Sequence, residues 1–569
     1  MSGSASRARR YVVLLGLLCG FGIVLFRLVN LQVLQASELA TKAGRQHQKT
    51  VSLEGARGTI VDRHGKILAM NVEVPSVFGV PTALDNPTKT ARYLSSILHL
   101  QSDDLERKLR QDRSFVWLAR KLDPEQGHVL DRLPLDGVGV VMEGRRFYPK
   151  GPLLAHVLGF AGMDGDGLEG VEHRYESYLR GEKRLMVLQR DALGRTVFPK
   201  GQVEQSPAPG HSLTLTIDEV IQYIVERELE VAVSRSHAKS GIIIALDPET
   251  GALLAMAVSP RFDPNTVSKL TADRWRNKAL ADAYEPGSTM KVIMAAAAIE
   301  ERVVKPNTMV FGEHGRMTVA NTVMHDHEKL GWVSFAQVIQ KSSNIGAAKT
   351  GMALGDQRLY RYLRAFGFGQ KTDIDLPGEG QGLVKNVKDW GRRSVASISI
   401  GQEIGVTPIQ LVSAVAAIAN NGKLMKPYVV SEVRDGDGRI LKQVFPEVRR
   451  RVVSPETAQS VTKILEGVVT DGTGGRAAIP GFRVAGKTGT AQKFDPRTGT
   501  YSTSQFVASF VGYVPAERPR LAMLVMIDEP QGETLGGNVA APVFSRVGEQ
   551  VLSYLGVSSN EGVTVAMAW

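Results

Sequence analysis

The sequence predicts a two-domain protein that a single N-terminal helix anchors in a membrane. Three observations support this fold class. Tyr11–Phe26 contains no charged residue, a stretch rich in proline and glycine runs from Glu204 to Ser212, and strand patterns at both ends of the remaining chain enclose helix patterns. We expect an elongated α+β module before the proline-rich stretch and an α/β sandwich with one antiparallel sheet after it.

The apolar run, together with the residues after it, is long enough to cross a bilayer. A helix over Tyr11–Phe26 spans about 24 Å, somewhat less than the roughly 30 Å of a bilayer core. The apolar pattern continues after Arg27, whose side chain can extend to the far interface. We therefore predict a transmembrane anchor over residues 11–34. The alternative is a cleavable signal peptide, which the length of the run and the lack of a small-x-small site directly after it disfavour.

Charges around the run predict its direction. Arg7, Arg9 and Arg10 precede it, and no acidic residue balances them. Because positive charges stay on the cytoplasmic side, residues 1–10 are expected to form a cytoplasmic tail, with everything after Leu34 on the outer side.

The composition fits a globular protein and disfavours nucleic-acid binding. The 569 residues are enough for two or three domains, and 43% apolar with 22% charged residues is typical of folded chains. The formal net charge of +11 is spread along the chain rather than gathered in a basic run. We therefore expect a solvated surface, suited to an anionic envelope polymer or lipid, and no nucleic-acid partner. The single cysteine, Cys19, excludes an intramolecular disulfide.

Residues 35–205 mix short strand and helix patterns. Arg57–Asn71 predicts two strands around a turn at Arg63–Gly65. Further segments of this kind are Gly144–Pro149 and Gly167–Glu182, and no catalytic group of residues appears among them. We expect a non-catalytic pedestal module.

Residues 211–555 are expected to form the sandwich domain, and residues 556–569 a flexible tail. Strands are predicted over Ser212–Asp218, at both ends of Ser240–Val258 around a turn at Pro248–Gly251, and on either side of Pro515–Pro519. Helices are predicted over 219–233 and near 288–302, 334–350, 408–421 and 455–470.

The first candidate site is Ser288 followed by Lys291. Residues i and i+3 of a helix share a face, and Pro286–Gly287 favours a helix start at Ser288. Alone, this pattern is typical of an N-cap serine and a surface lysine. Val292–Ile299 is apolar nearly all round, however, so we expect the helix to be buried. A buried lysine must find partners or lose its proton, and a neutral lysine is a base that can activate a serine.

Two further motifs follow, Ser342-Ser343-Asn344 and Lys487-Thr488-Gly489. Alone, the first is typical of polar residues at a helix end and the second of a glycine-rich edge or bulge, although glycine in a strand often marks close approach of the backbone to a ligand. In this order, S-x-x-K, S-x-N and K-T-G form the signature of penicillin-interacting serine enzymes.

With these motifs the chain resembles a class B penicillin-binding protein, the monofunctional D,D-transpeptidase type with a β-lactamase-like catalytic domain. The middle motif is S-S-N rather than S-D-N, which departs from the class A β-lactamases. The length, the absence of a glycosyltransferase module and the short C-terminal tail favour the septal, FtsI-like subtype, with the elongation subtype as the close alternative. The other segments that carry the resemblance are Arg57–Ala69, Arg145–Pro149, His156–Phe160, Gly167–Glu172, Phe366–Glu379 and Ser399–Leu411.

The resemblance implies catalytic roles for five residues. Ser288 is the expected nucleophile and Lys291 the expected base for acylation. Ser342 and Asn344 are expected to shuttle protons and to orient the substrate amide. Lys487 is expected to bind a carboxylate and to help keep Lys291 neutral.

The resemblance also implies how substrate is held. Ser343, Thr488, Gly489 and Thr490 are the expected substrate-binding residues. The backbone N–H groups of Ser288 and Thr490 are expected to form an oxyanion hole, in which each donor contributes on the order of 3 kcal/mol. No metal or cofactor is expected.

The implied substrate is a peptidoglycan stem peptide ending in D-Ala-D-Ala, and β-lactams are the implied inhibitors. The implied location is the bacterial inner (cytoplasmic) membrane, with the catalytic domain periplasmic. A polytopic, FtsW-like glycosyltransferase and other division proteins are the implied partners.

Three alternative functions are less favoured. A D,D-carboxypeptidase or β-lactamase fits poorly with the large N-terminal module and the anchor. A β-lactam-sensing receptor needs further membrane spans, and a scaffold of the division complex does not need three intact motifs. The two histidines of Met324–Lys329 are typical of zinc ligands, but nothing else clusters with them, so we expect a surface loop there.

Overall fold

The computed structural model describes residues 4–39, 48–113, 115–123, 126, 137–190, 196–197, 207–267, 271–495 and 497–559. The chain forms two compact units, one of Met1–Ala56 with Gly181–Pro209 and the other of Arg57–Arg180 with Gly210–Trp569. Most of the predicted tail and the first part of the proline-rich stretch lie outside the described residues.

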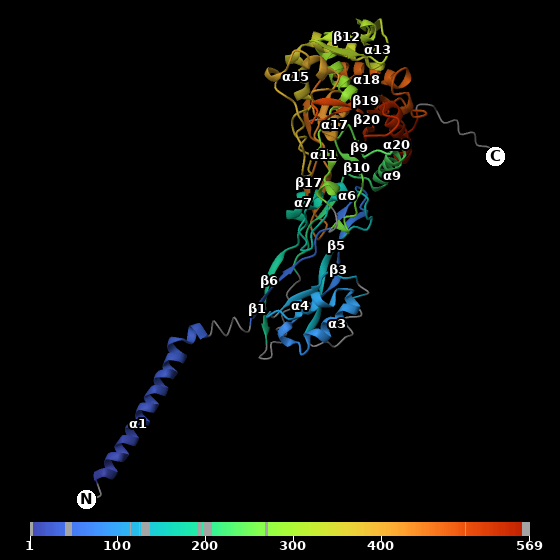
Figure 1. The fold of residues 1–569 in the computed structure, drawn as a ribbon. Helices are drawn as coiled ribbons and strands as arrows, with labels where there is room; N and C mark the ends of the chain where they lie inside the picture. Colours follow the sequence, from blue (N-terminus) through green and yellow to red (C-terminus); the bar gives the residue numbers. More distant parts are fainter. Residues whose placement is uncertain are drawn as a thin grey trace, which may run out of the picture. The chain divides into compact units, whose positions relative to one another are not determined.

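The first unit contains the N-terminal helix and a small sheet (Figure 1). Helix α1 spans Ser4–Val29 and continues as a π-helical turn over Asn30–Leu34. The segment Arg7–Leu34 is long and apolar enough to cross a membrane, and none of its most apolar part is buried. An exposed apolar helix of this length fits the predicted anchor. The small sheet pairs β1 (Gln48–Glu54) with β6 (Lys183–Arg190), and β6 with β7 (Thr196–Val197).

The centre of the second unit is a five-stranded antiparallel sheet, which confirms the predicted sheet. Its strand order is β10-β9-β21-β20-β19. Since β21 pairs with β9, strands from both ends of the C-terminal domain meet at the middle of one sheet. The strands are β9 (Ser240–Leu246), β10 (Leu253–Ser259), β19 (Ala485–Asp495), β20 (Thr500–Val514) and β21 (Leu521–Asp528).

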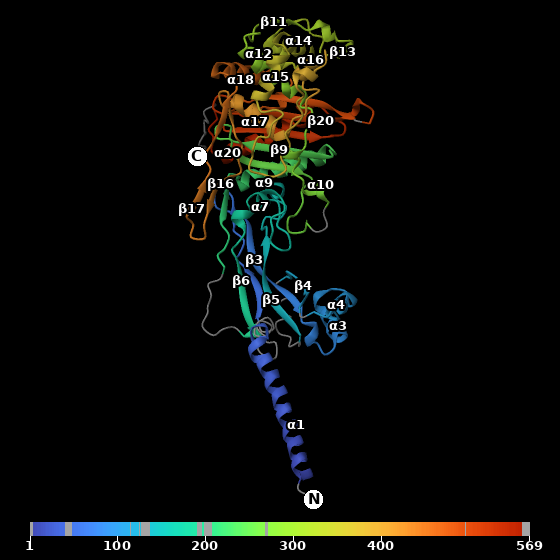
Figure 2. The same ribbon diagram turned by 90° about the vertical axis from the view of Figure 1, so that its left-hand side faces the viewer.

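Helices cover both faces of this sheet, which makes it the middle layer of the predicted sandwich. Every residue of β9 is buried, and successive side chains of a strand point to opposite faces. Ile242 and Ile244 belong to the core that includes α12 and α17, whereas Ile243 and Ala245 belong to the core that includes α9 and α20. Figure 1 shows α17 and α9 on opposite sides of β9 and β10, and in Figure 2, turned by 90°, α17 overlaps the strands. The four helices are α9 (Glu219–Arg235), α12 (Lys291–Glu300), α17 (Pro408–Ala419) and α20 (Ala541–Tyr554).

Smaller elements complete the catalytic domain. The helices are α10 (Ala272–Trp275), α11 (Lys278–Ala281), α13 (Phe335–Gln340), α14 (Asn344–Leu354), α15 (Asp356–Ala365), α16 (Ser394–Ser399), α18 (Pro455–Thr470) and α19 (Gly536–Val539). Two-stranded sheets pair β11 (Met309–Phe311) with β14 (Trp332–Ser334), β12 (Arg316–Val319) with β13 (Thr322–His325), and β15 (Lys423–Met425) with β18 (Val448–Arg451).

The predicted helix over 334–350 is wrong in one respect, because the chain breaks it into α13 and α14. Ser342 has φ +59°, in the left-handed region, which ends α13. Ser343 then begins α14 as its N-cap, and its hydroxyl accepts a hydrogen bond from Gly346 N at 2.9 Å. The S-S-N motif therefore forms the break between two helices.

A second sheet joins strands from the N-terminal module to strands from the catalytic domain. Its order is β17-β16-β8-β2-β3-β4, and β5 pairs with β3. The predicted turn at Arg63–Gly65 is confirmed, since it joins β2 to β3. The strands are β2 (Ile60–Val61), β3 (Ile67–Gly79), β4 (Val116–Ala119), β5 (Val138–Phe147), β8 (Ser212–Leu215), β16 (Val430–Arg434) and β17 (Ile440–Gln443), and the helices of the module are α3 (Pro87–Leu98), α4 (Ser102–Leu109), α6 (Ala155–Leu158), α7 (Gly170–Arg174) and α8 (Glu176–Leu179).

A buried ion cluster holds together three segments of the N-terminal module. Glu172 is fully buried, and its carboxylate accepts hydrogen bonds at 2.6 Å from Arg57 Nε and from Arg146 Nε. Tyr148 donates to the same carboxylate at 3.2 Å. A buried carboxylate is tolerated when its oxygens are paired in this way, and removing one partner is costly. The cluster therefore specifies how these segments pack.

Candidate active site

Ser288 lies on a short turn that leads into a buried helix. The 3-10 turn spans Gly287–Met290, and α12 begins at Lys291. Gly287 has φ +55°, and a Cβ at this position would lie 3.1 Å from Thr490 O, so glycine suits both the conformation and the packing. The first eight residues of α12 are all buried, as the apolar run predicts. Lys291 therefore enters the core with its helix.

The Lys291 amine is bonded to the S-S-N motif. Its Nζ lies 2.6 Å from Ser342 O, 2.8 Å from Asn344 Oδ1 and 3.2 Å from Ser342 Oγ. The Ser342 carbonyl lies outside both α13 and α14, so it is free to accept this bond. The break between the two helices thus creates the binding place for the buried amine.

Lys487 contacts the same serine from strand β19. Its Nζ lies 3.0 Å from Ser342 Oγ and 3.0 Å from Thr488 O, and its side chain is fully buried. The Ser342 hydroxyl therefore has two amine neighbours, Lys291 and Lys487. The three motifs, which are far apart in the sequence, converge on this one hydroxyl.

Burial lowers the pKa of both lysines. It brings the pKa of Lys291 down to about 7, while the carboxylate of Asp326 acts in the opposite direction. Burial, and then the charge of Lys291, hold the pKa of Lys487 well below its ordinary value. From the sequence, a charged Lys487 is expected to keep Lys291 neutral. Burial disfavours the charged form of Lys487 as well, so this role stays a prediction.

Two glycines allow the turn Gly287–Met290 to pack between β19 and the loop after α16. We call it the nucleophile turn, because it carries the predicted nucleophile Ser288. A Cβ on Gly489 would lie 2.9 Å from Thr289 Cγ2. On the loop side, Gly401 O accepts a hydrogen bond from Gly287 N at 3.1 Å, and a Cβ on Gly401 would lie 2.0 Å from Gly287 O. No side chain fits at either position. The groups that crowd Gly489 are the Ser509 hydroxyl, 2.4 Å from a Cβ at this position, and the nucleophile turn.

The other predicted site residues have partners inside the protein. Thr488 Oγ1 and Thr473 Oγ1 share a hydrogen bond of 2.7 Å, and Thr490 Oγ1 accepts from Gly536 N at 3.0 Å. Ser343 is almost fully buried as the N-cap of α14. In the part of the chain that the structure describes, the Ser288 hydroxyl has no hydrogen-bond partner. Catalytic hydrogen bonds often form only when substrate is bound.

The sequence did not single out Asp326 as a site residue, yet it holds the S-S-N motif in place. Its carboxylate accepts hydrogen bonds from Ser343 Oγ and Asn344 N, each at 2.5 Å, and from Ile345 N at 3.0 Å. These are the first N–H groups of α14, where a negative charge is favourable. Asp326 therefore orients Asn344, which binds Lys291. From the sequence, the segment around Asp326 is expected to be only a surface loop.

The segment Met324–Lys329 has structural partners. Besides Asp326, Glu328 accepts a hydrogen bond from Lys341 Nζ at 2.9 Å, and His325 O accepts from Asn344 Nδ2 at 2.9 Å. Over the described ranges, no group of three or more His, Cys, Asp or Glu lies close enough together to hold a metal ion.

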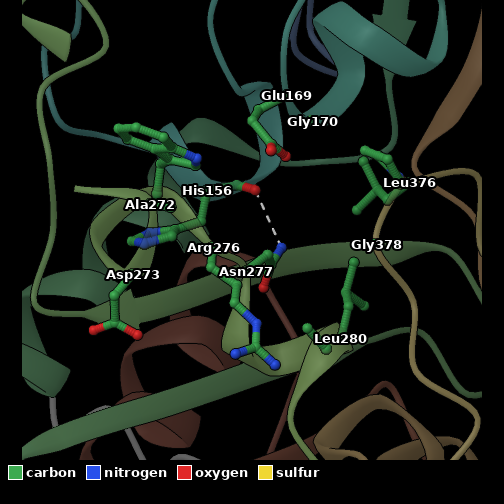
Figure 3. Close-up of a pocket in the computed structure, with 13 residues that line it drawn as sticks. His156, Glu169, Gly170, Ala272, Asp273, Arg276, Asn277, Leu280, Leu376 and Gly378 are labelled. Atoms are coloured by element: carbon green, nitrogen blue, oxygen red, sulfur yellow. Dashed lines mark hydrogen bonds between the residues drawn. The ribbon is translucent and has the colours of Figure 1, made fainter. Parts of the chain in front are cut away.

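A separate cavity of about 380 Å³ lies between α6, the start of α7, the segment 272–281 and Leu376–Gly378. Figure 3 shows Glu169 and Arg276 on different sides of it, and the Asn277 amide donates to His156 O at 3.1 Å. Burial lowers the pKa of His156 to about 4, which keeps this imidazole neutral. None of the lining residues belongs to the three motifs.

The family model for the penicillin-binding protein transpeptidase domain matches residues 241–549, which contain all three motifs. The chain belongs to this family. A second model, for the penicillin-binding protein dimerisation domain, matches residues 52–215. The fold class predicted from the sequence is confirmed: an N-terminal apolar helix, a module of the class B type and a transpeptidase domain with an antiparallel sheet.

Named relatives cover nearly the whole chain of this penicillin-binding protein. Stage V sporulation protein D of Bacillus subtilis is 36% identical over 94% of this chain and 85% of its own length. Peptidoglycan D,D-transpeptidase FtsI of Escherichia coli K12 is 32% identical over 96% of this chain and 92% of its own length. The crystal structure of penicillin-binding protein 3 from Mycobacterium tuberculosis, complexed with aztreonam, superimposes with a TM-score of 0.70 at 28% identity, covering 90% of this chain and 98% of that one.

We predict that Asp326→Asn moves the pH dependence of acylation. The negative charge of Asp326 raises the pKa of Lys291. Removing this charge favours the neutral amine, so the acid limb of the acylation rate should shift to lower pH. The measurement is the rate of labelling by a fluorescent penicillin between about pH 5 and pH 9, where an amine with a pKa near 7 titrates.

The matched control for this prediction is Glu328→Gln. Glu328 is an exposed acid on the same segment, and its carboxylate binds Lys341 rather than the S-S-N motif. The control should leave the acid limb unchanged. An acid limb that stays in place in Asp326→Asn would contradict the electrostatic link to Lys291.

Proposed function

We propose that this chain is a serine-type peptidoglycan D,D-transpeptidase that cross-links stem peptides ending in D-Ala-D-Ala. The observation that carries the proposal is the buried Lys291 amine, which is bonded to Ser342 and Asn344 and has a pKa lowered to about 7. Such an amine is neutral often enough near pH 7 to accept a proton from a serine hydroxyl. The relative named peptidoglycan D,D-transpeptidase FtsI supports the substrate class.

In the proposed acylation, Ser288 Oγ attacks the carbonyl carbon of the penultimate D-alanine while Lys291 takes the hydroxyl proton. The N–H groups of Ser288 and Thr490 stabilise the oxyanion, each by on the order of 3 kcal/mol. When the peptide C–N bond breaks, the proton passes to the departing D-alanine amine. The Ser342 hydroxyl, between Lys291 Nζ and Lys487 Nζ, is suited to relay it.

We assign the terminal carboxylate of the stem peptide to the K-T-G strand. Lys487, Thr488 and Thr490 supply the cation and hydroxyl groups for it, and Asn344 completes the substrate-binding set. Ser343, predicted as a further member, is buried with its hydroxyl bonded to Asp326, so we assign it to holding Asn344 in place. An arriving carboxylate raises the pKa of Lys487 and stabilises its charge. That charge lowers the pKa of Lys291, so substrate binding itself favours the neutral base. The predicted role of Lys487 therefore applies to the enzyme with bound substrate.

The second half of the reaction releases the acyl group. An amine from a neighbouring stem peptide attacks the Ser288 ester carbonyl, and Lys291 takes a proton from this amine. The ester C–O bond breaks, Ser288 regains its proton, and a new amide bond joins the two peptides. A β-lactam acylates the same serine, which the solved complex of a similar penicillin-binding protein 3 with aztreonam supports.

We further propose a septal role at the bacterial inner membrane. The likeness to FtsI supports it. The anchor over residues 11–34 would leave residues 1–10 in the cytoplasm and place the pedestal (35–205) and catalytic domain (211–555) on the periplasmic side. An FtsW-like glycosyltransferase is the proposed membrane partner.

The catalytic proposal predicts that Ser288→Ala folds but no longer forms a covalent adduct. Full-length protein in detergent is incubated with a fluorescent penicillin and, separately, with a D-Ala-D-Ala pentapeptide and an acceptor amine. The wild type should label, release D-alanine and form the cross-linked product, because a serine ester precedes both outcomes. The alanine variant should do none of these.

Ser342→Ala distinguishes the assigned roles in the same assays. It keeps the nucleophile and should label slowly rather than not at all. Release of D-alanine by the wild type without any cross-linked product would identify a carboxypeptidase instead. Labelling of Ser288→Ala at the wild-type rate would remove Ser288 from the reaction.

The septal proposal predicts the shape of cells from which the protein is depleted. A septal enzyme is needed for division but not for elongation, so depleted cells should grow into filaments. Light microscopy of a depletion strain measures this outcome. Rounded cells would assign the protein to elongation, and cells of normal shape would exclude both roles.

A further inference from the structure

Glu285, three residues before Ser288, joins two distant parts of the chain. Its Oε1 accepts hydrogen bonds from the hydroxyl of Tyr501 and from the backbone N–H of Glu403, each at 2.9 Å. Its other oxygen, Oε2, is buried and has no hydrogen-bond partner among the described residues. We call Glu285, Tyr501 and the Glu403 N–H the Glu285 bridge. None of its three residues belongs to the S-x-x-K, S-S-N or K-T-G motif.

Tyr501 lies on the outer part of the β19–β20 hairpin, where β20 no longer pairs with β21. Strand β20 pairs with β21 only along Val507–Val514, so residues 500–506 have β19 as their strand neighbour. The register also shifts there, because Gln492 faces Phe506 whereas Phe494 faces Tyr501. This bulge bends the hairpin locally. The hydrogen bond to Glu285 is therefore an attachment of the outer hairpin that the strand ladder does not provide.

Glu403 anchors the opposite end of the Glu285 bridge. It has φ +60°, and its carboxylate accepts hydrogen bonds from Arg393 Nε at 3.1 Å and from Ser394 Oγ at 2.7 Å. The same loop carries Gly401, whose carbonyl binds the nucleophile turn at Gly287 N. This loop is fixed at both residues.

The Glu285 bridge thus connects the two walls between which the nucleophile turn is packed. One wall is β19, which carries Lys487 and Thr490, and the bridge reaches it through Tyr501 of β20, the strand partner of Phe494. The other wall is the loop of Gly401 and Glu403. Because Glu285 lies three residues before Ser288, its carboxylate fixes the position of both walls relative to the Ser288 turn.

We propose that Glu285 is a positioning residue for acylation, which through Tyr501 and the Glu403 N–H sets the distance between the Ser288 turn and the K-T-G strand. The inference rests on the proposed function, since this distance separates the two N–H groups assigned to the oxyanion hole. An oxyanion hole works only when its donors are held at a fixed geometry before reaction. Small misplacements reduce the rate of the chemical step more than they reduce binding.

The test is acylation kinetics of full-length Tyr501→Phe in detergent. Stopped-flow labelling with a fluorescent penicillin separates the binding constant Ks from the first-order acylation constant k2. Removing the hydroxyl should lower k2 by roughly tenfold, as expected for a misplaced reacting group, and change Ks by less than about twofold. Glu285→Ala should lower k2 further, and the double variant should equal Glu285→Ala, because both changes break one unit.

Tyr362→Phe is the matched control. Tyr362 donates to Glu301 at 2.8 Å, so this variant removes the same kind of bond away from the motifs. It should leave k2 unchanged. Glu285→Gln keeps an acceptor oxygen and should restore most of the k2 that Glu285→Ala loses, which a purely structural loss would not do.

Two results would overturn the inference while the proposed function stands. One is a wild-type k2 in Tyr501→Phe, and the other is a double variant whose loss of k2 equals the product of the two single losses. A wild-type protein that does not label at all would instead refute the proposed function, so the two failures are distinguishable.

Discussion

The burial of the Lys291 amine is the constraint on which the active site depends. A charged amine in a protein core loses its hydration, so it must be bonded, lose its proton, or both. Here Ser342 O and Asn344 Oδ1 supply the bonds, and burial lowers the pKa to about 7. The same burial that makes the lysine costly for the fold therefore makes it a base near neutral pH.

Several local features follow from this need. The helix break at Ser342 provides a carbonyl outside the helices, and Asp326 fixes Asn344 at the start of α14. Glycines at 287, 401 and 489 let the nucleophile turn pack directly against backbone on two sides. Each of these positions restricts either the backbone conformation or the residue type, and each brings a polar group to the buried amine or fixes the turn that carries Ser288.

Local patterns predicted much of this architecture, and distant partners account for what they missed. Alternating and apolar patterns correctly predicted strands β9, β10, β20 and β21, and the apolar run after Ser288 correctly predicted that Lys291 is buried. Each of these signals lies within one segment of the sequence. The break at Ser342 was not predicted, although polar residues such as those of the S-S-N motif are typical of a helix end, because none of these residue types requires a helix to stop. Asp326, Tyr501 and Glu403 were missed because their roles depend on contacts with residues remote in sequence, for which a single sequence carries no signal.

The neutral-base role of Lys291 is tested most directly by the pKa of its side chain in the full-length protein. Lysines labelled with carbon-13 at Cε report protonation by NMR, and the Lys291 resonance is assigned by its loss in Lys291→Arg. A buried neutral base predicts a titration midpoint of about 7. An amine that stays charged to pH 9 or above would contradict a neutral-base role for Lys291.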